Sequence, residues 1–402
     1  MMSKALDYVC IFTGGSIRGG AYVGALRAME ELGINSKCYV GSSVGSVISV
    51  FYAVGYNPDE LEQIVNEFNF ELFKDINLSF NKDFSISRGE YFLEWVREKI
   101  EKKYYGENYK KGSNPAVTFK DLKQDIIILS TNLYTTKAKI FSKQETPDFE
   151  IAKAVRISSG MPGLLKATEL NGQLLVDGDL SRSWPIWKII PSLFNYDCRI
   201  LEFRLEGGRE RFSIDNSADY LNSVYTAFSN FAADHIISTY EDRDKFDYIR
   251  LDAGNVNLTD FNLSAERKKH LYSTGYITTM DFFKKTLPRK RALILPHYEK
   301  ILNELELVRT YFANSKYVLA KNKLSELFVT ISKSRKIIDS DYYVAILDFY
   351  EKFINNLFVA FAVMTVIKEK KQLTKLLDDI IAEISEKVAE IKNFIDADLI
   401  NR

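Results

Sequence analysis

The chain has 402 residues, of which 46% are hydrophobic and 27% are charged. That balance is typical of globular proteins of two or three domains and excludes a largely disordered chain and a polytopic membrane protein. Lysine plus arginine and aspartate plus glutamate number 54 each, so the formal net charge is zero and no global basic field attracts nucleic acid. The function must therefore be inferred from local motifs.

The first two-thirds of the chain alternate between short apolar runs and segments with helical spacing. The predicted strands and helices are, in chain order, a strand at 8–13, a helix at 16–32, a strand at 38–40, a helix at 44–54 and strands at 126–131 and 174–176. Strands that alternate with helices predict an α/β layer fold with a mainly parallel sheet.

The last third has a different pattern, because the chain from His297 to Arg402 contains neither glycine nor proline. That absence favours long helices. Apolar residues three and four positions apart predict an amphipathic helix with one apolar face: Leu373, Leu376, Leu377, Ile380, Ile381, Ile384, Val388 and Ile391. Such a helix usually packs against its own domain, and binding to a membrane or a partner is the alternative. Residues 286–296 are the predicted linker between a domain at 1–285 and a helical region at 297–402.

Targeting and redox signals favour a reducing compartment. Three scattered cysteines give neither a disulfide framework nor a paired metal site. The N-terminus lacks the long apolar run and cleavage site of a Sec signal peptide. The longest apolar stretch, 357–367, is shorter than the about 20 residues that span a bilayer. We expect a cytoplasmic protein, and export without an N-terminal signal stays open.

The loop Gly14-Gly15-Ser16-Ile17-Arg18-Gly19-Gly20 lies between a predicted strand and a predicted helix, so its N–H groups are suited to an anion. A dinucleotide fingerprint needs glycine where Ser16 stands, and a Walker loop needs a Gly-Lys-Ser/Thr ending that is absent. An oxyanion hole needs only two well-placed amides. The predicted oxyanion residues are Gly14, Gly15, Ser16, Ile17, Arg18 and Gly19. Arg18 either braces the loop by bonding carbonyls or begins the helix in solvent.

The sequence Gly41-Ser42-Ser43-Val44-Gly45 matches G-x-S-x-G between an apolar strand and an apolar helix, which is the context of a nucleophile elbow. Its glycines allow backbones to approach closely, and the first amides of the next helix favour negative charge beside the Ser43 hydroxyl. An incidental turn is the alternative. We predict that Ser43 is the nucleophile, which also favours the oxyanion reading of the preceding loop.

A carboxylate is the best candidate for the base. The chain has three histidines, and none of them lies in a glycine-rich or turn context. They are His235, His270 and His297. Asp177 ends an apolar strand, and a carboxylate at the carboxyl end of a strand in an α/β fold faces the same rim as the other loops. An ordinary Asp-Gly turn and the neighbouring Asp179 are the alternatives. We prefer Asp177 because Gly178 leaves space for the serine.

Together these motifs resemble the patatin-like phospholipase family, whose signature is G-G-G-x-R/K-G, then G-x-S-x-G, then D-G-A/G. The matching stretches are GGSIRG at 14–19, GSSVG at 41–45 and DGD at 177–179, and RISSGMPGLL at 156–165 resembles the family's Ser-x-x-x-Pro segment, with Ser158 and Pro162. The resemblance covers roughly the first 285 residues. Two residues differ from the family's pattern. Ser16 stands where the pattern has the third glycine of the loop. Asp179 stands where the pattern has a small residue after Asp-Gly. Its negative charge, of the same sign as that of Asp177, is expected to raise the pKa of Asp177.

The resemblance implies a patatin-like three-layer α/β fold with a mainly parallel central sheet, followed by an all-α C-terminal region. It implies a Ser43–Asp177 dyad that uses no histidine, metal or cofactor, in a lipid acyl hydrolase of the phospholipase A or lysophospholipase type. The substrate would be a phospholipid or lysophospholipid, reached through peripheral contact with a membrane. Two alternatives stay open: a latent lipase activated by a partner or ligand that binds the helical C-terminal region, and a non-catalytic interaction protein. The same region is a candidate for self-association.

Overall fold

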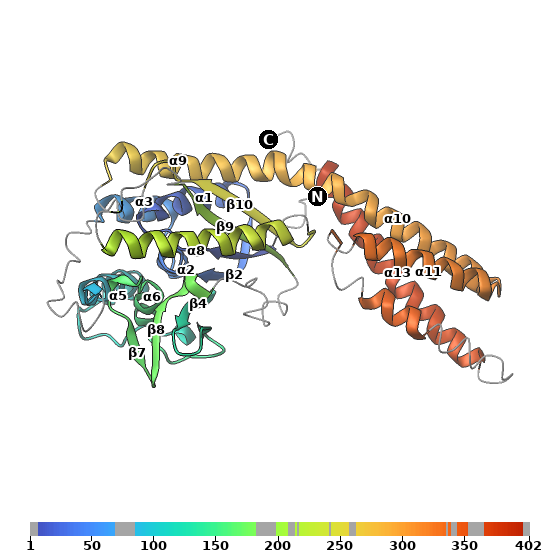
Figure 1. Ribbon diagram of the computed structural model, residues 1–402, viewed down its shortest axis with the longest axis horizontal. Coiled ribbons are helices and arrows are strands. Elements are labelled where there is room, and N and C mark those ends of the chain that lie inside the picture. Colours follow the sequence, from blue (N-terminus) through green and yellow to red (C-terminus); the bar gives the residue numbers. More distant parts are fainter. Residues whose placement is uncertain are drawn as a thin grey trace. The chain divides into compact units, whose positions relative to one another are not determined.

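The computed structural model describes residues 7–68, 85–181, 198–207, 214, 217–240, 243–256, 263–334, 337–338, 344–352 and 366–396. By backbone contacts the chain divides into two compact units (Figure 1). The α/β unit comprises Ala5–Ser238 and Asp247–Asp281, and the helical unit comprises Met1–Lys4, Thr239–Phe246 and Phe282–Arg402.

The central sheet is mixed and follows the order β10-β9-β1-β2-β4-β8-β7, with β5 also paired to β4. Its strands are β1 (Asp7–Phe12), β2 (Asn35–Gly41), β4 (Asp125–Asn132), β5 (Lys137–Ser142), β7 (Thr168–Leu170), β8 (Gln173–Asp177), β9 (Arg199–Glu206) and β10 (Phe246–Asp252). The pairs β1–β2, β1–β9 and β2–β4 are parallel. Strand β1 is a continuous apolar run because it is buried on both faces, as parallel central strands usually are. A small parallel pair, β3 (Ser85–Ser87) and β6 (Gly163–Leu165), lies apart.

Helices cover the sheet and hold the loops at its edges. They are η1 (Ser16–Gly19), α1 (Gly20–Glu31), α2 (Val44–Ala53), α3 (Pro58–Glu67), α5 (Glu90–Tyr105), η3 (Gly106–Asn108), η4 (Phe119–Asp121), α6 (Ile151–Ser158), η5 (Gly178–Ser181), α8 (Ser217–Tyr240) and α9 (Ala265–Asp281). Helix α2 packs on β1, β2 and β4, and α6 packs on β4 and β8. Helix α1 lies along α9 (Figure 1). The predicted alternation of strands and helices is confirmed.

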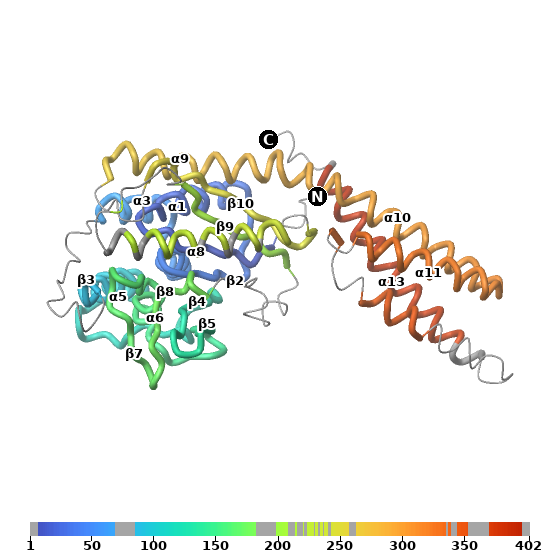
Figure 2. The backbone as a smooth tube through the Cα atoms, viewed as in Figure 1, coloured from blue at the N-terminus to red at the C-terminus, as the bar shows by residue number. Residues whose placement is uncertain are grey.

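Strands β2 and β8 meet end to end along one edge of β4. Figure 2 labels the three strands within the α/β unit. Residues 127–128 of β4 pair with both β2 and β5, and residues 130–132 pair with both β8 and β5, so β2 and β8 share the edge opposite β5. Strand β2 runs parallel to β4 and ends with Gly41 opposite Ile128. Strand β8 runs antiparallel to β4 and ends with Asp177 opposite Ser130. The ends of the two strands are thus about 7 Å apart along β4.

The direction of β8 was not predicted from the sequence. We expected only that a carboxylate at the carboxyl end of a strand faces the same rim as the other loops. Strand β8 is antiparallel to β4 and approaches from the opposite direction. Hydroxyl groups of β4 fix its end, because Ser130 donates to the Val176 carbonyl and Thr131 donates to the Asp177 carbonyl, each at 2.7 Å.

The helical unit has a hydrophobic core of its own. Its elements are the π-helical turn η7 (Phe282–Thr286), α10 (Leu287–Ala313), α11 (Tyr317–Ser334), a helix at 344–352 and α13 (Val366–Asp396). Helix α10 packs against both α11 and α13. The amphipathic helix predicted near the chain's end is confirmed, because the core includes Leu373, Leu377, Ile380, Ile381, Ile384, Val388 and Ile391, with Leu376 partly buried against it.

The segment expected as a linker, 286–296, is helical from position 287 onward, where it belongs to α10. Pro288 lies in the first turn of that helix, where a missing N–H costs nothing. Pro296 lies inside the helix. The assignment of 1–285 and 297–402 to separate domains stays a prediction.

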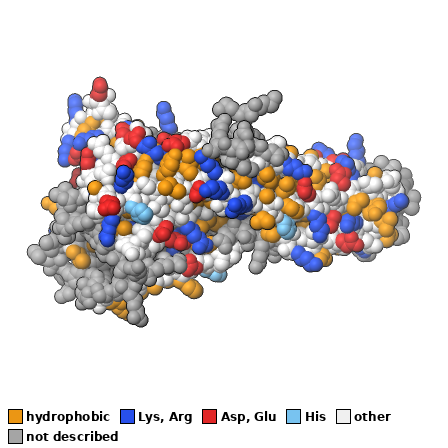
Figure 3. Space-filling model, turned by 90° about the horizontal axis from the view of Figure 1, so that it is seen from above, with side chains coloured by type: hydrophobic (Ala, Val, Ile, Leu, Met, Phe, Trp, Pro, Cys, Tyr) orange, Lys and Arg blue, Asp and Glu red, His pale blue; other side chains and the backbone are white. Residues whose placement is uncertain are grey.

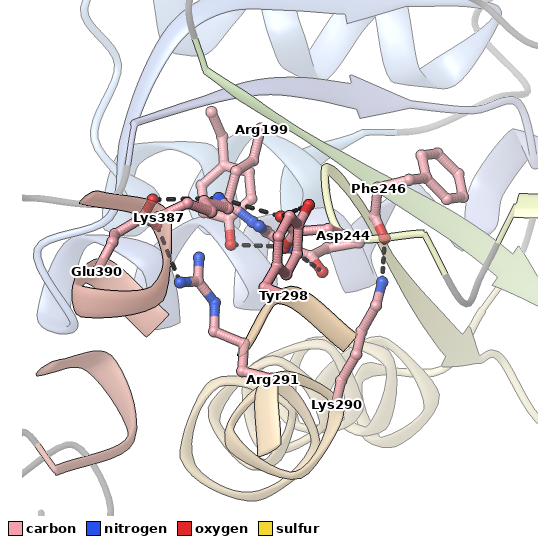
Figure 4. A network of polar contacts seen from close by, with 10 residues as sticks. Arg199, Asp244, Phe246, Lys290, Arg291, Tyr298, Lys387 and Glu390 are labelled. Atoms are coloured by element: carbon pink, nitrogen blue, oxygen red, sulfur yellow. Dashed lines mark hydrogen bonds and ion pairs between the residues drawn. The ribbon is translucent and has the colours of Figure 1, made fainter. Parts of the chain in front are cut away.

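Charged side chains are buried in the helical unit as a connected network (Figure 4). The Asp244 carboxylate accepts from the Tyr298 hydroxyl and pairs with Lys387, each at 3.1 Å. Lys387 also contacts Glu390, which pairs with Arg291 at 3.0 Å. Loss of one partner from a buried ion pair leaves an uncompensated charge, which costs about 3–5 kcal/mol. The network therefore fixes the register of α10 and α13 more strictly than apolar contacts alone.

No helix among the described residues is both long and apolar enough to cross a membrane. The longest apolar stretch of the sequence, 357–367, lies for the most part outside the described residues. On the face drawn in Figure 3, acidic and basic side chains are interspersed. That mixture matches the zero formal net charge of the sequence.

Glycine at position 178 is required where β8 meets β4. A Cβ there would overlap the Leu129 carbonyl oxygen, which belongs to the backbone and cannot move aside. We expect Gly178→Ala to lower the free energy of unfolding by about 1–3 kcal/mol in urea titrations. Gly20→Ala is the control, because its Cβ would meet only ordinary contacts at 3.6 Å or more. Equal stability of the two variants would contradict the close approach of β8 to β4.

Candidate active site

Ser43 occupies a sharp turn between β2 and α2. Its φ of 51° and ψ of −130° are unusual for a residue with a side chain. Such backbone strain costs about 1–3 kcal/mol and is concentrated at functional sites. The elbow lies directly against β1, since the Ser42 N–H donates to the Phe12 carbonyl at 3.1 Å and a Cβ at Gly45 would overlap the same oxygen. The G-x-S-x-G context predicted from the sequence is thus present in the fold.

Asp177 ends β8 as a buried carboxyl group, only 1% exposed. Its Oδ1 accepts the Asp179 N–H at 2.9 Å and the Tyr225 hydroxyl at 3.1 Å. Its buried Oδ2 has no partner of full hydrogen-bond geometry in the described part of the chain. The neighbouring Ser43 side chain interacts with this carboxyl and favours its charged form. Asp177 therefore has accepting capacity left on the side where the candidate nucleophile lies.

Burial is the main cause that raises the pKa of Asp177, to about 7. The negative charge of Asp179 raises it further, while hydrogen bonds from the Asp179 N–H, Ser43 and Tyr225 lower it. A carboxyl group with a pKa near neutrality can accept and release a proton under ordinary conditions. Asp177 therefore has the properties of a general base.

The glycine loop turns directly into η1. Ser16 has a φ of 55°, and Ser16 and Ile17 open this helix, so their N–H groups have no intrahelical acceptor. Arg18 is buried and braces the loop: its Nε donates to the Gly15 carbonyl at 3.1 Å and its Nη1 to the Gly207 carbonyl at 3.3 Å. Burial lowers the pKa of Arg18 to about 10. The bracing role predicted for Arg18 is confirmed, and the solvated alternative is wrong.

The segment that resembles Ser-x-x-x-Pro holds both candidate catalytic residues. Ser158, the last residue of α6, accepts the Ser43 N–H at 3.0 Å through its Oγ. Two residues later, the Gly160 carbonyl accepts the Asp177 N–H at 3.0 Å. One short segment thus fixes the backbones of the elbow and the strand end relative to each other.

An apolar cavity of about 130 Å³ opens beside Ser43. Helices α2 and α3 each contribute one face, with side chains three, four and seven positions apart, and α5 and the loop after α6 close the remainder. The lining residues are Ser16, Ile17, Gly19, Gly20, Ser43, Val44, Val47, Ile48, Phe51, Leu61, Ile64, Val65, Phe68, Phe92, Trp95, Ser159, Met161, Leu164 and Leu165. The cavity is lined almost entirely by hydrocarbon and suits an alkyl chain.

Two contacts at the site escaped sequence reasoning. Tyr225 comes from α8, 48 residues after Asp177, and no motif marks it. Asp179 was considered as a competitor for the base and as a like charge beside Asp177, but its contact with the glycine loop was not predicted. Among the rejected histidines, His297 bonds Ser334 within the helical unit. No group of three or more metal-binding side chains is found among the described residues.

Comparisons with known proteins find a family, related sequences and a similar fold. The family model described as Patatin-like phospholipase matches residues 11–188. Protein R571 of Acanthamoeba polyphaga mimivirus is 30% identical over 65% of this chain and 89% of its own. A probable lipid hydrolase, 463L of Invertebrate iridescent virus 6, is 24% identical over 44% of this chain and 61% of its own. The crystal structure of VipD from Legionella pneumophila is similar in fold, with a TM-score of 0.50 at 15% identity, over 98% of this chain and 91% of its own.

The Ser158 hydroxyl is predicted to stabilise the elbow. Ser158→Ala removes the acceptor of the Ser43 N–H, so we expect a loss of about 1–2 kcal/mol in the free energy of unfolding. The adjacent Ser159→Ala is a matched control, because the buried Ser159 hydroxyl has no hydrogen-bond partner in the described residues. Urea titration distinguishes them. A Ser158→Ala variant as stable as Ser159→Ala would argue against this bond.

Proposed function

Since this chain belongs to the patatin-like phospholipase family, we propose that it is a lipid acyl hydrolase with Ser43 as nucleophile and Asp177 as base. One observation supports this most strongly. The strained elbow at Ser43 and the buried carboxyl group of Asp177, whose pKa is near neutrality, lie together on one edge of β4. Phospholipids and lysophospholipids are the proposed substrates, and reaching them requires peripheral contact with a membrane or micelle surface.

The proposed reaction has two acyl-transfer steps. Asp177 takes the proton from Ser43 Oγ as this oxygen forms a bond to the ester carbonyl carbon. The tetrahedral intermediate then expels the alcohol, which receives that proton from Asp177, and leaves an acyl group on Ser43. In the second step Asp177 takes a proton from water, the water oxygen attacks the acyl carbon, and Ser43 regains its proton as the acid leaves. Such base assistance supplies about 10²–10⁴-fold in rate.

The proposed oxyanion hole lies in the loop before η1. Of the loop amides expected to contribute, the Gly14 N–H donates to Asp179 and the Arg18 N–H donates to the Gly15 carbonyl. The N–H groups of Gly15, Ser16 and Ile17 are the better donors, because they precede or begin a helix and its dipole points positive charge toward them. Each oxyanion donor is worth about 3 kcal/mol of transition-state stabilisation.

The cavity beside Ser43 is the proposed acyl site. Its wall on α2 runs from Val44 to Phe51, seven helical steps that rise about 10 Å. At that depth Phe51 packs against Trp95, with ring centroids 5.5 Å apart. Because carbon–carbon bonds are about 1.5 Å long and an extended chain zigzags, this depth holds about eight carbons. We propose that one acyl chain enters with its ester beside Ser43 and its methyl end toward the aromatic pair.

A latent enzyme is the second candidate. The helical unit has its own core and buried charge network, which favours a separate module over a mere extension of the sheet layer. A partner or ligand bound there would then activate the hydrolase, or two chains would associate through it. An inert protein whose Ser43 still reacts with a phosphonate would favour this candidate.

Substitution of the proposed dyad tests the function directly. We expect the wild-type protein to hydrolyse short-chain esters and a fluorescent phospholipid. Ser43→Ala should lower kcat by at least about 10³-fold and Asp177→Asn by about 10²–10⁴-fold, with circular dichroism unchanged. An active-site phosphonate should label wild-type Ser43, as read by peptide mass spectrometry. A wild type inert on every ester and unlabelled at Ser43 would overturn the proposal.

The acid side of the pH–rate profile should report Asp177. Its base form is the reactive one, and burial raises its pKa to about 7. Activity should therefore be lost as the pH falls through about 7 and should reach a plateau above it. Initial rates on a soluble ester between pH 5 and 9 measure this. A plateau that extends unchanged to pH 5 would contradict Asp177 as a buried base.

Trp95 is predicted to limit acyl-chain length. Trp95→Ala opens the end of the cavity, and because each buried CH₂ is worth about 0.8 kcal/mol, two further carbons should raise the kcat/KM preference for longer esters by about tenfold. A chain-length series of nitrophenyl esters measures the shift. Tyr91→Ala on the same helix is the control, because Tyr91 is exposed and does not line the cavity. An unshifted chain-length optimum would contradict the assignment of this cavity as the acyl site, but it would not bear on the proposed dyad.

A further inference from the structure

Asp179 brings together three segments of the candidate site. Its Oδ1 accepts the Gly14 N–H at 3.0 Å and the Ser42 hydroxyl. Its own backbone N–H donates to Oδ1 of Asp177 at 2.9 Å. One residue, which departs from the small residue of the D-G-A/G pattern, thus contacts the glycine loop, the nucleophile elbow and the strand end that carries the candidate base.

Gly14 provides the space that this carboxylate occupies. A Cβ at position 14 would overlap Asp179 Oδ2 and would lie 3.0 Å from the Ser43 Cβ. Any side chain at position 14 would therefore displace the carboxylate or crowd the nucleophile. The absence of a side chain at Gly14 and the presence of a carboxylate at Asp179 are two parts of one packing arrangement.

Resting on the proposed acyl-transfer function, we propose that Asp179 is a positioning residue whose carboxylate staples the glycine loop to the serine elbow. By the staple we mean the contacts of Asp179 Oδ1 with Gly14 and Ser42. It fixes the loop amides relative to Ser43 before substrate arrives, so the oxyanion site needs no reorganisation. The Gly14 N–H is committed to the staple, which leaves Gly15, Ser16 and Ile17 to receive the oxyanion.

The staple also places a negative charge beside the proposed base. The groups that face Asp177 are Asp179 on η5, Tyr225 on α8 and Ser43 at the elbow. Arg18 on η1 lies near enough to Asp179 for the negative charge of Asp179 to favour the charged form of Arg18. Burial is the main cause of the raised pKa of Asp177. Among the described groups that face Asp177, the Asp179 carboxylate is the one that raises this pKa further, so removal of its charge should lower it. The residue that positions the loop therefore also contributes to the pH range of activity.

Two substitutions of Asp179 distinguish its role in positioning the loop from the effect of its charge on Asp177. Asp179→Asn keeps an acceptor oxygen for Gly14 and Ser42 but removes the charge. We expect its plateau kcat to stay within about threefold and the acid limb of its pH–rate profile to move to lower pH. Asp179→Ala removes the acceptor as well, and we expect kcat to fall about 10–100-fold with little change in KM, because a misplaced oxyanion site loses transition-state binding. Asp148→Asn removes an exposed charge as the control and should change neither quantity.

Hydrogen exchange of the full-length protein gives a readout that needs no activity. Amides in peptides covering residues 12–20 and 41–46 should exchange faster in Asp179→Ala but not in Asp179→Asn. Unchanged exchange in Asp179→Ala, or an acid limb that does not move in Asp179→Asn, would overturn the proposal, and the Asn variant keeps it decidable if the Ala variant fails to fold. A wild type that is inert on all esters and unlabelled at Ser43 refutes the proposed function instead, and the exchange data still decide whether the staple exists.

Discussion

The edge of β4 that β2 and β8 share is the constraint on which the candidate site depends. A strand edge offers a fixed row of hydrogen-bonding groups, and here two strands from opposite directions divide it between them. Their ends must lie close together, because Gly41's partner Ile128 and Asp177's partner Ser130 are only two positions apart in β4. The serine elbow follows one end and the candidate base is the other. The geometry of the pair is therefore a property of sheet pairing and not of flexible loops.

The remaining polar contacts reinforce this meeting point. Ser158 and Gly160 bond the backbones of Ser43 and Asp177, so the loop after α6 closes the site from another element. The same burial that makes these bonds stable in a low dielectric penalises a charge on Asp177 and raises its pKa. Burial is therefore the common cause of the stable hydrogen bonds at this point and of the raised pKa of Asp177. The strain at Ser43 is retained because the surrounding bonds determine the backbone completely.

Much of this site could be predicted from sequence, because its parts are local. The elbow, the glycine loop and the strand ending at Asp177 each lie within a few residues whose spacing demands a particular turn. Contacts between distant segments could not be predicted. Nothing near Tyr225 marks its hydroxyl as a partner of Asp177, and nothing in the Asp177-Gly178-Asp179 sequence indicates that Asp179 reaches Gly14. The strand end at Asp177 was predicted, but the antiparallel pairing of β8 with β4 was not. The helix that begins at Leu287 was not predicted either, because proline is common in the first turn of a helix as well as in linkers.

A crystal structure of the protein after reaction with an alkyl phosphonate tests the central claim most directly, because the adduct mimics the tetrahedral intermediate. The proposed site predicts phosphorus bonded to Ser43 Oγ and a phosphoryl oxygen about 2.7–3.1 Å from amides among Gly15, Ser16 and Ile17. It also predicts the Asp177 carboxyl group beside Ser43 Oγ and the alkyl chain in the cavity along α2. An adduct on another residue, or a phosphoryl oxygen turned away from the glycine loop, would contradict it.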